Sequence, residues 1–218
     1  HLVVVAHPDD EILGFGGAGR KFVNNGDKVF PLIISAYAEM RSSRPSTEIL
    51  FKNALDANKI LGFEKPIFGE FPNIRLNNVD HIDLVKFIEK YISIINPTHI
   101  YTHHPNDLNN DHHQVSIACQ AAARFFQRDK NITPLKQFSF MEIPSSTDWA
   151  FSQGSDSFKP NYFVDIEKTI EYKLNALMCY EGVIRNSPHS RSKEAIKALS
   201  LYRGAQSNSL NAEAFQLV

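Results

Sequence analysis

The stretch LVVVAHPDDEILGFGGAG, residues 2–19, decides which fold the sequence predicts. Leu2 to Ala6 is a short, continuously apolar and mostly β-branched run, which is typical of a strand buried on both faces of a sheet. From Glu11 onward the apolar residues follow a helical spacing that continues to Val23. The segment therefore predicts a buried strand, a polar turn with the sequence HPDDE, and a helix. Together these form the first part of a βαβ unit.

The same alternation of strand and helix continues along the chain. We expect further strands at 28–35, 66–68, 98–104, 138–142 and 162–164, and further helices at 48–61, 79–95, 111–126, 166–180 and 192–202. Pro31 weakens the strand at 28–35. Alternation through the first 126 residues predicts right-handed βαβ units. The predicted fold class is α/β, with a mostly parallel sheet flanked by helices, in a single domain spanning residues 1–218.

Composition limits the kinds of partner that the protein is expected to bind. A net charge of -1 gives no electrostatic argument for binding to nucleic acid or to an anionic membrane. No apolar stretch approaches the roughly 20 residues of a transmembrane helix, and no signal peptide is visible. Cys119 and Cys179 lie outside any C-x-x-C pattern, so we expect two buried free thiols in a reducing compartment. These observations predict a cytoplasmic protein; the oligomeric state, including a homo-oligomer, stays open.

The three glycines Gly14, Gly16 and Gly19 have the G-x-G-x-x-G spacing of a dinucleotide site. Such a site needs its first glycine in the turn directly after the strand, whereas Gly14 follows Ala6 by eight residues, inside the predicted helix. Three acidic residues occupy the turn where a pyrophosphate would lie. The segment LIISAYA also ends without the acidic residue expected to bind a ribose. We therefore expect these glycines to permit close packing of the helix instead.

The acidic turn favours a metal site. His7 and Asp10 are three residues apart across a turn from strand to helix, and His112 follows another strand whose end lies at the same edge of the sheet. Helix capping would explain one acidic residue, but not a histidine and several acids together. Two imidazoles and one carboxylate form the ligand set of a catalytic zinc site. The same set also accepts iron (Fe²⁺), cobalt or manganese.

Two further acids have expected roles beside these ligands. Asp9 adjoins the ligand Asp10, and an unligated carboxylate next to a metal can take a proton from the attacking water. Asp111 adjoins His112 and is expected to orient an imidazole.

The motif AHPDDE at 6–11, together with HPNDLNNDH at 104–112, resembles the PIG-L (LmbE-like) family of zinc-dependent de-N-acetylases. The ending at 188–218, PHSRSKEAIKALSLYRGAQSNSLNAEAFQLV, is similar to that family too. The resemblance implies a Rossmann-like fold and a metal-dependent enzyme that hydrolyses an N-acetyl group from an amino sugar. It also implies roles for five residues: His7, Asp10 and His112 as metal ligands, Asp9 as general base, and Asp111 as the acid preceding the last ligand.

The sequence departs from the family pattern at two positions. Asn109 stands where many members have a histidine, and because an asparagine cannot shuttle a proton, the general acid stays open between Asp9, His104 and His189. Asn73 stands where members often have an aspartate, which bears on contacts to a sugar hydroxyl. Candidate substrate-binding residues lie on the expected loops, although each is also compatible with an ordinary surface position: Arg41, Arg44, Asn73 and Arg75, with His189.

The sequence alone leaves two alternatives to an amino-sugar deacetylase. One is a related amidase that acts on another amide, such as a thiol-sugar conjugate. The other is a non-catalytic sugar- or metal-binding module. The unligated Asp9 argues against a mere binding module, because binding has no need of it. The sugar, its aglycone and the native metal stay open, and a lipid-linked substrate is compatible with the sequence.

Overall fold

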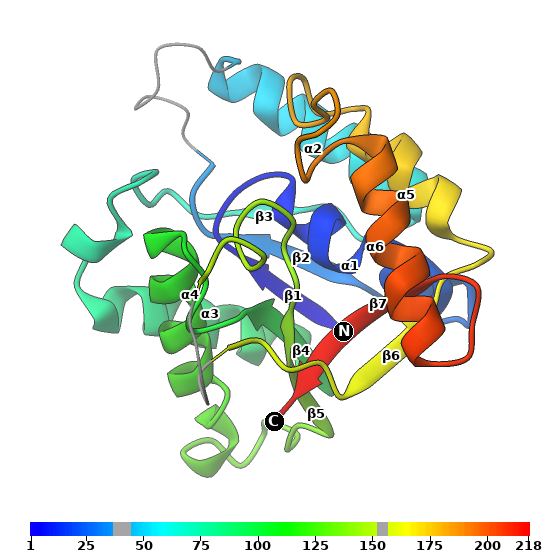
Figure 1. The fold of residues 1–218 in the computed structure, drawn as a ribbon. Helices are drawn as coiled ribbons and strands as arrows, with labels where there is room; N and C mark the ends of the chain where they lie inside the picture. Colours follow the sequence, from blue (N-terminus) through cyan, green and yellow to red (C-terminus); the bar gives the residue numbers. More distant parts are fainter. Residues whose placement is uncertain (37–44, 152–156) are drawn as a thin grey trace.

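The computed structural model describes residues 1–36, 45–151 and 157–218 (Figure 1). Within these ranges the strands form one seven-stranded sheet in the order β3-β2-β1-β4-β5-β7-β6. Their bounds are β1 Leu2–Val5, β2 Phe30–Ile33, β3 Ile67–Phe68, β4 His99–His103, β5 Gln137–Met141, β6 Tyr162–Asp165 and β7 Ala212–Leu217. Only β7, among these described strands, runs antiparallel to its neighbours β5 and β6. The expected mostly parallel α/β sheet is thus confirmed.

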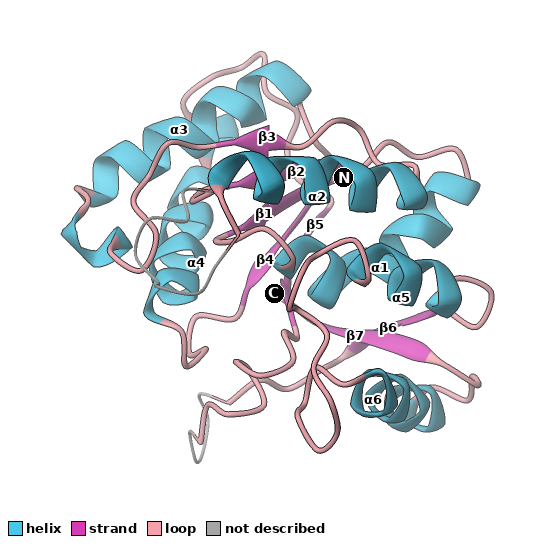
Figure 2. Ribbon diagram, turned by 90° about the horizontal axis from the view of Figure 1, so that it is seen from above, coloured by secondary structure: helices cyan, strands magenta, loops and turns pink. Residues whose placement is uncertain are grey.

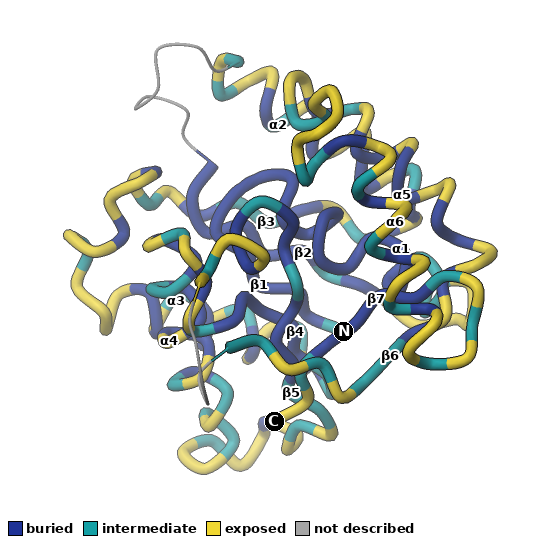
Figure 3. The backbone as a smooth tube through the Cα atoms, in the orientation of Figure 1, coloured by how far each residue is buried: buried dark blue, intermediate teal, exposed yellow. Residues whose placement is uncertain are grey.

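Helices cover both faces of the sheet (Figure 2). Their bounds are α1 Asp10–Asn24, α2 Thr47–Leu61, α3 His81–Ile95, α4 Asn110–Ala122, α5 Ile170–Leu177 and α6 Lys193–Gln206. Alternate residues of β1 serve the two faces: Val3 and Val5 pack in a core with α1, α2 and α5, whereas Leu2 and Val4 pack with α3 and α4. Because β1 is buried on both faces, it is apolar throughout, and it runs through the buried centre of Figure 3.

The structure corrects several expected elements. Residues 212–217 form β7, which we did not expect. Helix α5 begins at Ile170 because the preceding residues form a turn, in which the Asp165 side chain accepts a hydrogen bond from the Glu167 N–H. Helix α4 ends at Ala122 and a short 3₁₀ helix follows at Phe125–Gln127. Of the two free thiols, Cys119 is buried as expected but Cys179 is only partly buried.

Pro31 lies inside β2 without breaking the sheet. Phe30 and Ile34 donate their backbone N–H groups to the carbonyls of His1 and Val5, on the side of β1, so the nitrogen of Pro31 faces the other side, towards β3. There the pairing begins only at Leu32, which lies opposite Ile67. The N–H group that proline lacks is therefore not required by the strand pairing.

The strand order places a switch point between β1 and β4. The chain proceeds from β1 to β2 on one side, and from β4 to β5 on the other. Helix α1 begins at Asp10, directly after β1, and α4 begins at Asn110, after β4. Ligands of open α/β sheets bind beyond the carboxyl ends of the strands at such a point. The two polar motifs therefore meet there.

In the described parts of the chain, no helix has both the length and the apolar character needed to cross a membrane.

Candidate active site

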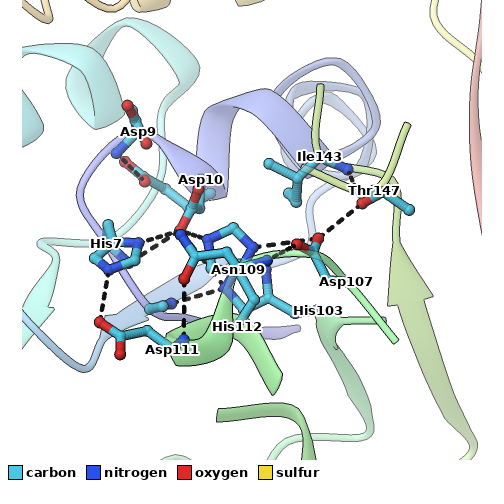
Figure 4. Close-up of polar contacts among 12 residues, drawn as sticks. His7, Asp9, Asp10, His103, Asp107, Asn109, Asp111, His112, Ile143 and Thr147 are labelled. Atoms are coloured by element: carbon cyan, nitrogen blue, oxygen red, sulfur yellow. Dashed lines mark hydrogen bonds and ion pairs between the residues drawn. The ribbon is translucent and has the colours of Figure 1, made fainter. Parts of the chain in front are cut away.

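Three buried side chains converge at the switch point (Figure 4). Asp10 Oδ2 lies 3.4 Å from His7 Nδ1 and 3.2 Å from His112 Nε2. In a tetrahedral zinc site with bonds of about 2.0–2.1 Å, neighbouring donor atoms are roughly 3.3 Å apart. The spacing and the chemistry of His7, Asp10 and His112 therefore fit one divalent cation.

A second carboxylate contacts each imidazole at the ring nitrogen that does not face Asp10. Asp111 Oδ2 lies 3.1 Å from His7 Nε2, and Asp107 Oδ2 lies 3.2 Å from His112 Nδ1. Each pair fixes the orientation of its ring and leaves the other ring nitrogen facing Asp10. We expected Asp111 to orient an imidazole, and the ring that it contacts is that of His7 rather than its neighbour in the sequence. The contact of Asp107 was not foreseen; the only available signal was an acid in the turn between His104 and His112.

Hydrogen bonds from other residues fix both of these carboxylates. Asp111 accepts from the backbone N–H groups of Ile74 and Leu76, at 2.6 and 3.1 Å. Asp107 accepts from the Asn109 N–H and from the Thr147 hydroxyl, both at 2.9 Å. The loops at 73–76 and 143–147 are thereby tied to the start of α4, where the candidate ligand His112 lies.

The charges of the cluster attract a cation. Burial alone would lower the pKa of His112, but the carboxylates of Asp10 and Asp107 outweigh it and raise this pKa to about 10. Burial opposes ionisation of Asp10, yet His112 and His7 outweigh it, so its pKa lies well below the usual value. Three carboxylates thus surround two imidazoles, and the cluster as a whole stays negatively charged even when both rings are protonated.

His103 lies next to His112 and is fully buried. Its ring stacks on His112 with centroids 3.8 Å apart, and its Nε2 accepts a hydrogen bond from the Ala6 N–H at 2.8 Å. Burial, with the charge of His112, lowers the pKa of His103 to about 3. His103, Asp107 and His112 are also spaced like metal ligands. However, His103 and Asp107 are not among the described residues that line the cavity, whereas His7, Asp10 and His112 all line it, so we assign the cation to the group of His7, Asp10 and His112.

Asp9 lies beside the ligand group without belonging to it. It is the residue before α1, with φ 108° and ψ -30°, and its Oδ2 lies 3.3 Å from Arg191 Nη1. Burial and the charge of Asp10 raise the pKa of Asp9 to about 7, against the opposing effect of Arg191. A carboxylate that titrates near neutrality can both accept and release a proton.

A cavity of about 150 Å³ opens over these residues. It is lined by His7, Asp9, Asp10, Leu13, Asn73, Ile74, Asn109, His112, Ile143, Pro144, Ser145, Ser146 and Arg191. Asn73 is buried in this lining, and its Oδ1 has no hydrogen-bond partner within the described ranges. Asn109 caps α4, because its Oδ1 accepts from the Asp111 N–H at 2.9 Å. The cavity therefore combines a metal-type cluster, a carboxylate outside that cluster and two amides.

Comparison with known proteins identifies the family of this chain. The family model PIG-L, described as GlcNAc-PI de-N-acetylase, matches residues 2–123. The chain belongs to the PIG-L family. It is 25% identical over 228 residues to the diacetylchitobiose deacetylase of Thermococcus kodakarensis, with 100% of this chain and 82% of that protein covered.

Solved structures share the fold of this PIG-L chain. The N,N'-diacetylchitobiose deacetylase of Pyrococcus horikoshii has a TM-score of 0.81 at 17% identity, covering 100% of this chain and 82% of its own. The 4-carboxy-2-hydroxymuconate hydratase GalB of Pseudomonas putida KT2440 has a TM-score of 0.80 at 20% identity, covering 100% and 95%. Because a hydratase shares the fold, the fold by itself does not specify the reaction.

The remaining candidates of the sequence analysis lie elsewhere. His104 packs against the rings of Phe140 and Phe158, and its Nδ1 accepts from the Asn106 N–H. His189 and Arg75 are exposed. None of these three is among the described residues that line the cavity. Arg41 and Arg44 lie outside the described residues.

Arg191 is a charged cavity residue that sequence reasoning missed. It lies two residues after His189, in the segment PHSRS before α6, and reaches Asp9 from the far end of the chain. The only available signal was a basic residue within the ending that is similar to the PIG-L family.

Proposed function

We propose that residues 1–218 form one domain that acts as a metal-dependent hydrolase, removing an N-acetyl group from an amino sugar or a sugar conjugate. The observation that carries this proposal is the unligated carboxylate of Asp9, which lines the same cavity as the ligand group of His7, Asp10 and His112. Membership of the PIG-L family and the likeness to a diacetylchitobiose deacetylase support the choice of substrate class.

Nδ1 of His7, Oδ2 of Asp10 and Nε2 of His112 are the atoms that would hold the metal. Zn²⁺ is our first assignment, and Fe²⁺ and similar divalent ions suit the same donors. When bound, such a cation acts as a Lewis acid towards a carbonyl and lowers the pKa of water. Asp107 and Asp111 keep the two rings in the orientation that this binding requires.

The chain's own residues handle the proton and the substrate. Asp9 takes a proton from the water that adds to the acetyl carbonyl carbon, and returns it to the nitrogen as the C–N bond breaks, so that acetate and an amine are released. Asp9 serves in both steps because His104 is packed against aromatic rings and His189 is exposed. Asn73 presents its amide to the substrate from the lining of the cavity.

The test combines metal analysis with an assay of acetate release. Protein purified without added metal, and then loaded with Zn²⁺ or Fe²⁺, is incubated with N-acetylglucosamine, N,N'-diacetylchitobiose and other N-acetylated amino sugars. We expect one metal ion per chain and release of acetate. Asp9→Asn should keep the metal and lose turnover by about 10²–10⁴-fold. His112→Ala should lose the metal.

Three outcomes would contradict the proposal in different ways. Turnover retained by Asp9→Asn would remove Asp9 from the role of base. Bound metal without acetate from any N-acetylated sugar would point to another amide or to a binding module. Full metal occupancy in His112→Ala would refute the ligand assignment.

A further inference from the structure

Glu11 is a fully buried carboxylate that the proposed reaction does not use. Both of its oxygens have hydrogen-bond partners. Oε1 accepts from Asn58 Nδ2 at 2.9 Å and from the Tyr180 hydroxyl at 2.5 Å, and Oε2 accepts from the Asp9 N–H at 3.0 Å. Because burying a carboxylate is costly unless it is hydrogen-bonded, this arrangement requires all of its donors to be in place.

The backbone of Asp9 requires support from its surroundings. Its φ of 108° lies in the region that residues with a side chain rarely adopt, and such a conformation persists only where neighbouring contacts enforce it. The carbonyl of Asp9 accepts from the N–H groups of Ile12 and Leu13, at 3.1 and 2.9 Å. The N–H of Asp9 is held by Glu11 alone among the hydrogen bonds of the described residues.

The two oxygens of Glu11 have different partners. Oε1 is bound to the scaffold, through Asn58 on α2 and Tyr180 in the turn after α5. Oε2 is bound to the turn that carries Asp9. The carboxylate therefore connects the packed helices on one face of the sheet to the residue that lines the cavity.

We propose that Glu11 is a positioning residue, anchored by Asn58 and Tyr180, that holds Asp9 in its strained conformation with its carboxylate at the cavity. This inference rests on the proposed function, in which Asp9 moves the proton. It gives the last residue of the HPDDE motif a role distinct from metal binding and from proton transfer.

Glu11→Gln tests this role with almost no change of shape. An amide has one acceptor oxygen, and if that oxygen stays with Asn58 and Tyr180, the NH₂ group faces the N–H of Asp9. We expect a crystal structure of the variant to show residue 9 leaving φ 108°. With N,N'-diacetylchitobiose and Zn²⁺, kcat should fall by about 100-fold, since small displacements of a catalytic group have effects of that order. KM and the Zn²⁺ affinity should stay close to wild type.

Glu171→Gln is the matched control, because Glu171 is an exposed carboxylate on α5 outside the cavity lining. We expect its kcat and the conformation of residue 9 to match wild type. Tyr180→Phe removes one scaffold donor of Glu11 but keeps the bond between Glu11 and the Asp9 N–H, so it should lower stability and reduce kcat less than Glu11→Gln does. Should Glu11→Gln fail to fold, Glu11→Asp replaces it, because its shorter side chain keeps the charge but cannot span both sets of partners.

The outcomes separate this inference from the proposed function. An unchanged residue 9 together with a wild-type kcat in the Glu11 variant would overturn the inference, as would a fall in kcat that only parallels a loss of Zn²⁺ affinity. Turnover retained by Asp9→Asn would instead refute the proton-transfer role of Asp9. If the wild type releases no acetate from any sugar, the conformation of residue 9 in the variant still decides whether Glu11 holds it.

Discussion

Asp111 and His7 are 104 positions apart in the sequence, yet Asp111 Oδ2 lies 3.1 Å from His7 Nε2. Because the same carboxylate also accepts two backbone hydrogen bonds from the loop at 74–76, it joins β1, this loop and α4 at one point. Asp107 has the equivalent place behind His112. The site thus depends on two carboxylates that do not face the metal position.

Asp111→Asn and Asp107→Asn should each weaken metal binding by about 10–100-fold, because the ring behind the ligand atom loses its carboxylate partner. Competition titration of Zn²⁺ against a chromophoric chelator measures this change directly. Asp56→Asn, at an exposed position of α2, is the control and should leave the affinity unchanged. Equal affinities in all three variants would contradict the assignment of Asp107 and Asp111.

Variants of Asn109 should distinguish the role of this residue in capping α4 from any role in catalysis. Asn109→Asp retains an oxygen that can accept from the Asp111 N–H, whereas Asn109→Ala loses it and should cost about 1 kcal/mol of stability. We expect Asn109→His to lose the cap as well, but to keep or increase acetate release. Thermal denaturation and the acetate assay distinguish the two effects. A collapse of turnover in Asn109→His, beyond its loss of stability, would mean that the Asn109 amide contacts the substrate.

The convergence of the two motifs could be predicted from the sequence, because the carboxyl ends of parallel strands meet at one edge of the sheet. The pairing of each imidazole with its carboxylate could not. Asp107 and Asp111 both lie near His112 in the sequence, but the tertiary structure directs Asp111 to His7 and to the loop at 74–76. The contact of Arg191 with Asp9 could not be predicted either, because the two residues are 182 positions apart and Arg191 lies on a loop without a regular sequence pattern.

The last strand shows a second limit of sequence reasoning. In the segment AEAFQL, Glu213 is almost fully buried, so the alternation of polar and apolar residues that usually marks a half-exposed strand is misleading here. Glu213 is accommodated because Lys173 and two backbone N–H groups of α1 surround it. Such tertiary contacts override local propensity.

The ion pair between Lys173 and Glu213 should be important for stability. The two side chains are buried, with Lys173 Nζ 2.7 Å from Glu213 Oε1 and also 2.7 Å from the Leu13 carbonyl oxygen. Lys173→Met removes one partner and leaves a buried charge without its counter-ion, which should cost about 3–5 kcal/mol. Lys197→Met, which breaks the exposed pair with Glu171, should cost at most about 1 kcal/mol. Urea denaturation measures the free energy of unfolding of both variants. Equal losses of stability would contradict the greater importance of the buried ion pair.

Gly19 tests whether the glycines of α1 serve packing. A Cβ atom at this position would lie 2.3 Å from Cζ of Phe63 and 2.8 Å from Cδ1 of Phe15, two buried rings. Gly19→Ala should therefore lower the free energy of unfolding by about 1–3 kcal/mol through overpacking, despite the better helix propensity of alanine. At Gly16 the nearest atoms are 3.0 Å away in Ile12 and 3.2 Å away in Lys173, so Gly16→Ala should cost less. Urea denaturation of both variants measures the difference, and a Gly19→Ala protein as stable as wild type would show that close helix packing does not explain this glycine.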